Sequence, residues 1–180
     1  MSFALHTTRL ILRPMQIEDA KGMFELNNAD DILKNTGDRP FKNIEEAEAL
    51  IRNYKQFDQY KMGRFTLLLR STQEYIGWCG LKYIEETKEI DLGYRLLPQF
   101  RGNGLATEAA EKCLEYGFET LSLEKIIGRA IHENKASINI LQKIGMTFEK
   151  KFNAHDEICD QYKMTKHEWN NRMIELKNNL

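Results

Sequence analysis

The sequence has few of the features that place a protein in a specialised class. Its 180 residues include three cysteines without a C-x-x-C pair and four histidines without an H-x-x-x-H pair. Structural zinc sites use such pairs, so we expect no metal site and three buried or half-buried thiols in a reducing compartment. The formal net charge of -1 excludes a global field that attracts nucleic acid or anionic lipid, so neither is an expected partner.

Long apolar runs are also missing. No stretch approaches the ~20 apolar residues that a membrane span needs. The first residues lack the charged segment and apolar run of a secretory signal. We therefore expect a cytoplasmic protein. With 42% hydrophobic and 29% charged residues, the composition is typical of a soluble folded protein, and the length suits a single domain over residues 1–180.

Apolar periodicity predicts a mixed α/β fold. The expected strands cover residues 10–13, 64–70, 75–84, 89–97, 125–131, 147–153 and 158–165. The expected helices cover residues 17–27, 44–60, 105–121, 135–144 and 166–177, with an irregular connection over 28–42. The fold class is thus α/β with a twisted, mostly antiparallel sheet of about six to seven strands and flanking helices.

The strand at 89–97, the helix at 105–121 and the strand at 125–131 form a β-α-β unit, whose two strands must be parallel. Between the first strand and the helix lies Arg101-Gly102-Asn103-Gly104-Leu105-Ala106-Thr107. Its two glycines permit a tight turn and close approach of a ligand. The following helix directs unpaired N–H groups at the same point. This loop therefore predicts a phosphate-binding site.

Two common phosphate motifs do not match this loop. A P-loop requires Gly-x-x-x-x-Gly-Lys followed by Ser or Thr, which is absent. A dinucleotide fingerprint requires a third glycine, where this chain has Thr107. Glu124 lies about twenty residues further on, but it precedes the next strand instead of ending it. An NAD-dependent oxidoreductase is therefore a weak alternative.

Residues 101–106 resemble the phosphate loop of the GNAT superfamily of acetyl-CoA-dependent N-acetyltransferases and match it at every fixed position. The flanking segments 91–98, 106–109 and 134–146 resemble the branch that includes ribosomal-protein N-terminal acetyltransferases. The same branch is also resembled by residues 8–14 near one end of the chain and by residues 160–162 and 168–169 near the other. The resemblance covers nearly the whole chain and implies a GNAT fold.

The resemblance also implies which residues hold acetyl-CoA. Backbone N–H groups of the loop would surround the pyrophosphate, namely those of Arg101, Gly102, Asn103, Gly104, Leu105, Ala106 and Thr107. Leu96 and Leu97 would offer backbone groups to the pantetheine arm, and Asn134 its side-chain amide. The alternatives are a strand-to-helix turn that binds nothing, and an ordinary helix N-cap at Asn134.

Acetyl transfer to an amine needs a base, and release of the thiolate needs a proton. Glu89 and Asp91 lie two apart on one strand and so share a sheet face. The resemblance implies Asp91 as the base, directly or through water; the alternative is an exposed carboxylate or an arginine partner. Many members of the superfamily carry a proton-donating tyrosine where this chain has Leu141, and the resemblance to the branch implies Ser137 as the replacement. The alternative for Ser137 is an ordinary residue of the first helical turn. We expect no acetyl-cysteine intermediate.

The resemblance implies an acceptor that is a protein N-terminal α-amine, such as that of a ribosomal protein. A small amine, such as an aminoglycoside or polyamine, and a non-catalytic acyl-CoA-binding domain remain open. The acceptor is expected near segments 29–42 and 153–159, whose acidic side chains suit an ammonium group: Asp30, Asp31, Asp38, Asp156 and Glu157. A hydrophobic edge strand at 64–70 would support a homodimer.

Overall fold

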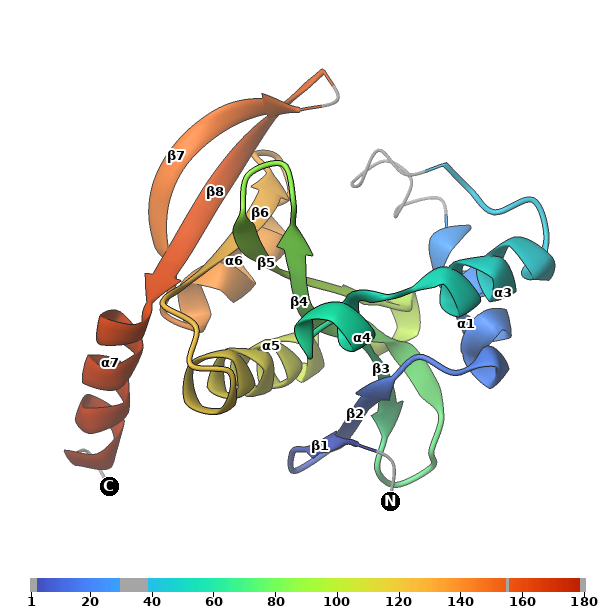
Figure 1. Ribbon diagram of the computed structural model, residues 1–180, viewed down its shortest axis with the longest axis horizontal. Coiled ribbons are helices and arrows are strands. Elements are labelled where there is room, and N and C mark those ends of the chain that lie inside the picture. Colours follow the sequence, from blue (N-terminus) through green and yellow to red (C-terminus); the bar gives the residue numbers. More distant parts are fainter. Residues whose placement is uncertain (1–2, 30–38, 155, 179–180) are drawn as a thin grey trace.

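The computed structural model describes residues 3–29, 39–154 and 156–178, which form a sheet of eight strands (Figure 1). The spatial order is β1-β2-β3-β4-β5-β6-β8-β7, and every neighbouring pair is antiparallel except β5–β6. The strands are β1 (Leu5–His6), β2 (Leu10–Pro14), β3 (Arg64–Leu69), β4 (Tyr75–Ile84), β5 (Glu89–Leu96), β6 (Lys125–Ile131), β7 (Thr147–Ala154) and β8 (Glu157–Thr165). The predicted mixed, mostly antiparallel sheet is confirmed.

The sheet has one strand more than the seven segments predicted. The additional strand, β1, has two residues and pairs with β2 through Leu5↔Leu12 and His6↔Ile11. A two-residue strand is too short to show alternation, so only its partner strand reveals it.

The helices are α1 (Ala20–Asn27), α3 (Ile44–Asn53), α4 (Gln56–Tyr60), α5 (Leu105–Glu115), α6 (Lys135–Lys143) and α7 (Lys166–Asn178). The helix expected over 44–60 is interrupted because Tyr54 adopts an extended conformation, with ψ 100°. The helix expected over 105–121 ends in a wider π-helical segment, Tyr116–Thr120. None of the described helices is long and apolar enough to cross a bilayer.

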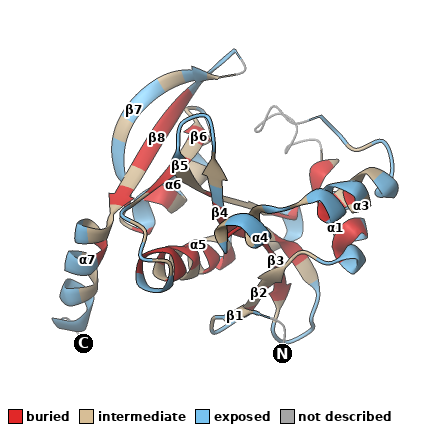
Figure 2. Cartoon of the chain, in the orientation of Figure 1, coloured by how far each residue is buried: buried red, intermediate tan, exposed pale blue. Residues whose placement is uncertain are grey.

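Most of the core lies between the sheet and helices α5 and α6 (Figure 2). Buried side chains of α5, including Ala109, Cys113 and Leu114, pack on strand residues such as Leu81 and Leu92. Cys79, Cys113 and Cys159 are free and buried, as the sequence predicts. A smaller cluster of Ala20, Met23, Ala47 and Ile51 joins α1 to α3. Helices thus flank the sheet, with α5 and α6 placed beside β5 and β6.

The predicted dimer edge is wrong. β3 pairs with β2 on one side and β4 on the other, so residues 64–69 lie inside the sheet. Among the described strands, the edges are β1 and β7. Both main-chain sides of β3 are used in the sheet, and it offers no edge for a second copy.

The parallel pair β5–β6 separates soon after it forms. Its paired residues are Asp91↔Ile127 and Leu92↔Gly128, although β5 continues to Leu96 and β6 to Ile131. Beyond Leu92, the β5 edge is therefore not paired with β6. This divergence opens the sheet where the chain enters the predicted phosphate loop, and an extended polar ligand can lie along the exposed edge.

Candidate active site

The predicted phosphate loop has the backbone geometry that its glycines suggested. Gly102 and Gly104 have φ values of 78° and 75°, in the left-handed region that favours glycine. A Cβ on Gly102 would meet nothing within 4 Å, and one on Gly104 would meet only Arg9 Nη2 at 3.5 Å. Backbone conformation, and not crowding, requires glycine at these positions. The space beside the loop is open to a ligand.

Helix α5 begins at the end of this loop, with Gly104 as its N-cap. The N–H groups of the first helical turn have no acceptor within the helix, so Leu105, Ala106 and Thr107 contribute positive dipole ends. All three residues line a cavity of about 450 Å³ between the loop, β5 and α6. We call this the donor cavity. Its position at a helix N-terminus suits phosphate.

The structure brings most of the predicted cofactor residues to this donor cavity. Its lining includes Leu96, Arg101, Gly102, Gly104, Leu105, Ala106, Thr107, Asn134 and Ser137. Leu97 is not among the lining residues: it is buried, its N–H donates to the Ile76 carbonyl at 2.9 Å, and its carbonyl accepts from Phe100. Asn103 is exposed and also lies outside the lining. The cofactor-binding roles of all these residues, Leu97 and Asn103 included, stay predictions.

Two arginines brace the loop. Arg101 Nε donates to the Leu96 carbonyl at 2.9 Å, which folds the side chain back over the end of β5. Arg9 Nη1 donates to the Asn103 carbonyl at 2.9 Å, and Arg9 Nε donates to Glu108 Oε2 at 2.6 Å. Sequence reasoning missed Arg9 as a functional residue, because nothing local connects it with a loop more than ninety positions away.

A second, larger cavity of about 850 Å³ lies on the other side of the β5–β6 divergence. Its lining includes Met15, Phe41, Tyr54, Trp78 and Asp91. We call it the acceptor cavity. Four residues line both cavities, namely Tyr94, Arg95, Asn134 and Ser137. The two cavities therefore meet at one place, between the end of β5 and the start of α6.

Asp91 lies in the acceptor cavity, but it is not an isolated carboxylate. Arg64 Nη2 donates to Asp91 Oδ2 at 2.5 Å, and both side chains are largely buried. The Arg64 guanidinium also contacts the carbonyls of Asp91 and Gly80. It needs the absence of a side chain at Gly93, where a Cβ would lie 2.7 Å from Arg64 Nη2. Within the described part of the chain, Oδ1 of Asp91 is not hydrogen-bonded.

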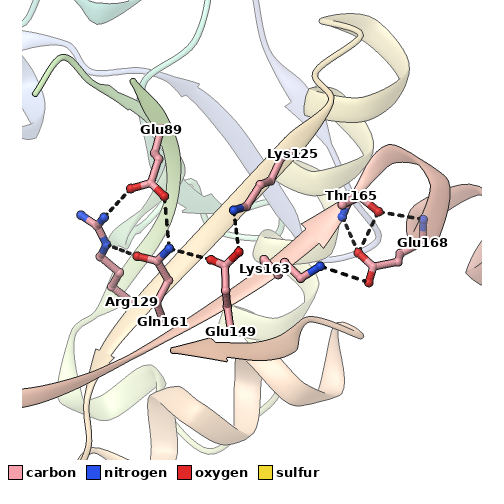
Figure 3. A network of polar contacts seen from close by, with 8 residues as sticks. All are labelled: Glu89, Lys125, Arg129, Glu149, Gln161, Lys163, Thr165 and Glu168. Carbon is pink, nitrogen blue, oxygen red and sulfur yellow. Dashed lines mark hydrogen bonds and ion pairs between the residues drawn. The ribbon is translucent and has the colours of Figure 1, made fainter. Parts of the chain in front are cut away.

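Glu89 shares the face of β5 with Asp91, as predicted, and is held by other partners (Figure 3). Arg129 Nη2 donates to Glu89 Oε2 at 2.6 Å, and Gln161 Nε2 donates to Oε1 at 3.2 Å. Gln161 Nε2 also donates to Glu149 Oε2, and Lys125 Nζ donates to Glu149 Oε1. Glu89 thus belongs to a network that ties β5 to β6, β7 and β8. Both its oxygens are engaged, unlike those of Asp91.

Helix α6 presents Asn134 and Ser137 at the junction. The Asn134 side-chain oxygen accepts from the Ser137 N–H at 3.1 Å, so Asn134 is the N-cap of α6. This leaves its side-chain NH₂ for another acceptor. The Tyr94 hydroxyl donates to the Ser137 carbonyl at 2.8 Å and lies 3.1 Å from Ser137 Oγ. Leu141 is buried against β6 and lines neither cavity.

The acceptor cavity is lined by more cations than anions. Among its described lining residues, Asp91 is the one carboxylate, against the basic residues Arg39, Arg64, Lys82, Arg95 and Arg129. Several of these are paired, Arg64 with Asp91 and Arg129 with Glu89. Two guanidiniums contact the Trp78 ring, with Arg64 and Arg95 at 5.2 and 5.3 Å from its centre.

The acidic residues predicted near the acceptor contribute little to this described lining. Asp156 and Glu157 line a separate hollow with Asn153, Ala154 and Ile158. Asp30, Asp31 and Asp38 lie outside the described residues. Cys159, the last residue of the predicted segment 153–159, does line the acceptor cavity.

Residues 9–147 match the family model described as an acetyltransferase (GNAT) domain. The chain is 32% identical to the "Uncharacterized N-acetyltransferase p20" of Bacillus licheniformis, over 82% of this chain and 83% of that protein. It is 27% identical to the spermidine N(1)-acetyltransferase of Escherichia coli K12, over 84% and 80%.

A crystal structure of spermidine N-acetyltransferase from Vibrio cholerae, in complex with CoA and spermine, superposes with a TM-score of 0.76. Its identity is 21%, covering 91% of this chain and 99% of that one.

The chain belongs to the GNAT acetyltransferase family. It is an acetyl-CoA-dependent N-acetyltransferase. The donor cavity fits that co-substrate in three respects. Positive-φ glycines and a helix N-terminus are available for the pyrophosphate, and the free β5 edge is available for the pantetheine amides.

Proposed function

We infer that this enzyme transfers the acetyl group of acetyl-CoA directly to a protein N-terminal α-amine, such as that of a ribosomal protein. The observation that carries this proposal is the meeting of the donor and acceptor cavities at Tyr94, Arg95, Asn134 and Ser137. A thioester and an amine held from opposite sides react without a covalent enzyme intermediate. Consistent with this, Cys79 and Cys113 are buried in the core, and burial raises the pKa of the Cys159 thiol in the acceptor cavity.

In this proposal, Asp91 accepts the proton of the amine, directly or through water. Arg64 holds Asp91 Oδ2, which leaves the second oxygen, Oδ1, to accept the proton. Ser137 donates a hydrogen bond to the sulfur as the thiolate leaves, and the Asn134 side-chain amide holds the pantetheine arm. The loop from Arg101 to Thr107 holds the pyrophosphate. These are the chemical roles that direct aminolysis of a thioester requires.

A peptide acceptor is favoured by the size and the apolar lining residues of the acceptor cavity. About 850 Å³ lined partly by Met15, Phe41, Tyr54 and Trp78 accommodates apolar side chains of a peptide. Among the described lining residues, basic side chains outnumber the single carboxylate of Asp91, which does not favour a polycation. A small amine remains the second candidate, because a relative that is 27% identical is a spermidine acetyltransferase. A cytoplasmic location is part of the proposal, since acetyl-CoA and new N-termini both occur there.

Thiol release from acetyl-CoA tests this proposal. The acceptors are peptides that begin with Ser, Ala or Met, their N-terminally blocked counterparts as matched controls, spermidine and an aminoglycoside. We expect release with free peptides and none with blocked ones. Release with spermidine alone would establish the small-amine alternative. Tight acetyl-CoA binding without release by any amine would indicate a non-catalytic acyl-CoA-binding domain.

A further inference from the structure

Tyr94 is a half-buried tyrosine of β5 whose hydroxyl reaches α6 at the junction of the two cavities. It donates to the Ser137 carbonyl at 2.8 Å and lies 3.1 Å from Ser137 Oγ, where either oxygen can be the donor. The Ser137 N–H is held by Asn134. The backbone of Ser137 is therefore fixed from two sides, and its hydroxyl is the part that can rotate toward a ligand.

We propose that Tyr94 is a positioning residue that orients the Ser137 hydroxyl toward the sulfur of coenzyme A. The inference rests on the proposed function and adds a second hydroxyl to it. The N–C bond forms, and the C–S bond breaks with its electron pair on sulfur. The proton lost by the amine balances the one gained by the thiol. Ser137 and Tyr94 both stay neutral and supply hydrogen bonds only. In the reacting complex the Tyr94 O–H turns from the Ser137 carbonyl to Ser137 Oγ, both of which lie within its reach, and the Ser137 O–H then donates to the thiolate.

The surroundings of Tyr94 suit a hydroxyl that keeps its proton. Burial raises the pKa of Tyr94 well above its ordinary value, and the hydrogen bond with Ser137 opposes this only in part. Nearby Cys79 and Asp91 also raise the pKa of Tyr94. A phenol in this state is a hydrogen-bond donor and not a base. A donor in a cavity partly shielded from water also stabilises a thiolate better than an exposed one.

The thiol of bound coenzyme A tests the inference without any acceptor amine. Iodoacetamide alkylates thiolates, so its rate across a pH series reports the thiolate fraction of bound coenzyme A, followed by mass spectrometry. The proteins are wild type, Tyr94→Phe, Ser137→Ala and the double variant, each saturated with coenzyme A as judged by calorimetry. We expect about tenfold less thiolate at a given pH in each single variant, and no further loss in the double variant.

Tyr116→Phe is the matched control, because it removes a buried hydroxyl that donates to the Lys61 carbonyl at 2.6 Å outside both cavities. It should behave as wild type. Ser137→Thr keeps a hydroxyl, so adding Tyr94→Phe to it should still lower the thiolate fraction of bound coenzyme A. The inference would be overturned if Tyr94→Phe showed the alkylation rate of wild type. It would also be overturned if the thiolate fraction of the double variant fell by the product of the two single-variant losses.

Turnover gives the second measurement, with whichever amine is acetylated fastest. Tyr94→Phe should lower kcat about tenfold and leave the KM for acetyl-CoA unchanged. A raised KM with unchanged kcat would show that Tyr94 only holds the cofactor site, which contradicts the inference. Lack of turnover by wild type with every amine counts against the proposed function, whereas an unaltered thiol titration counts against Tyr94 alone.

Discussion

Arg9 and Glu108 are ninety-nine positions apart and form a two-point contact beside the phosphate loop. Arg9 Nε donates to Glu108 Oε2 at 2.6 Å, and the Arg9 N–H donates to Oε1 at 2.9 Å. Since Arg9 Nη1 also donates to the Asn103 carbonyl, the start of β2 is tied to both the loop and the first turn of α5. The loop conformation thus depends on a residue that does not line the donor cavity.

Replacing Arg9 should therefore weaken acetyl-CoA binding without changing the rate of acetyl transfer. We expect Arg9→Ala to raise the KM for acetyl-CoA about fivefold, because the loop loses a charged hydrogen-bonding partner, and to change kcat little. Calorimetric titration with coenzyme A measures the same loss. Arg52→Ala is the control, since Arg52 pairs with Glu48 on the exposed face of α3. Equal affinity of Arg9→Ala and Arg52→Ala would refute this role.

The same contact predicts a pH dependence of stability. Burial raises the pKa of Glu108, but hydrogen bonds from Thr7 and Arg9 outweigh it and leave the pKa below the usual 4.5. A carboxyl group whose pKa is lower in the folded state stabilises the fold at pH values above its unfolded-state pKa. This contribution disappears as the pH falls through its folded-state pKa. The difference in unfolding free energy between wild type and Glu108→Gln should be largest near neutral pH and shrink below about pH 4.5. Urea unfolding at several pH values measures it; a pH-independent difference would contradict it.

Asp91 and Glu89 provide a matched pair for identifying the base. Both lie on one face of β5, and each is paired with an arginine. We expect Asp91→Asn to lower kcat about a hundredfold, as for loss of a general base. Glu89→Gln should lower the free energy of unfolding by about 1 kcal/mol and leave kcat within about threefold. Steady-state kinetics and urea unfolding of both variants separate the roles. Equal losses of kcat would mean that Asp91, like Glu89, only supports the sheet.

Leu141 tests whether the tyrosine of many relatives can be restored at its sequence position. Its side chain is 1% exposed, and Leu141 Cδ2 lies 2.6 Å from where a Cβ on Gly128 would stand. A tyrosine there has no room against β6. We expect Leu141→Tyr to destabilise the fold by about 1–3 kcal/mol through overpacking and to leave kcat no higher than wild type. Thermal unfolding and kinetics check this, with Leu141→Met as the volume-conserving control. A stable variant with raised kcat would show that position 141 faces the reaction.

The sequence predicts much of the fold because alternation, turns and loop glycines are local signals. The seven longer strands, the parallel β5–β6 pair and the positive φ of Gly102 and Gly104 all follow from such signals. The inner position of β3 does not, because strand order depends on which edges pair after folding. The break at Tyr54 also depends on tertiary contact, since the Tyr54 hydroxyl accepts the Arg64 N–H.

The amino-acid pattern alone was enough to predict the turn from Arg101 to Thr107 and the helix after it, because these residues are contiguous. Tertiary structure alone decided what surrounds the candidate active site. It placed Arg64 on Asp91, Arg9 on the loop and Tyr94 on Ser137. These partners are between 27 and 94 positions apart. Side-chain hydrogen bonds over such separations depend on strand register and helix packing, which no local pattern specifies.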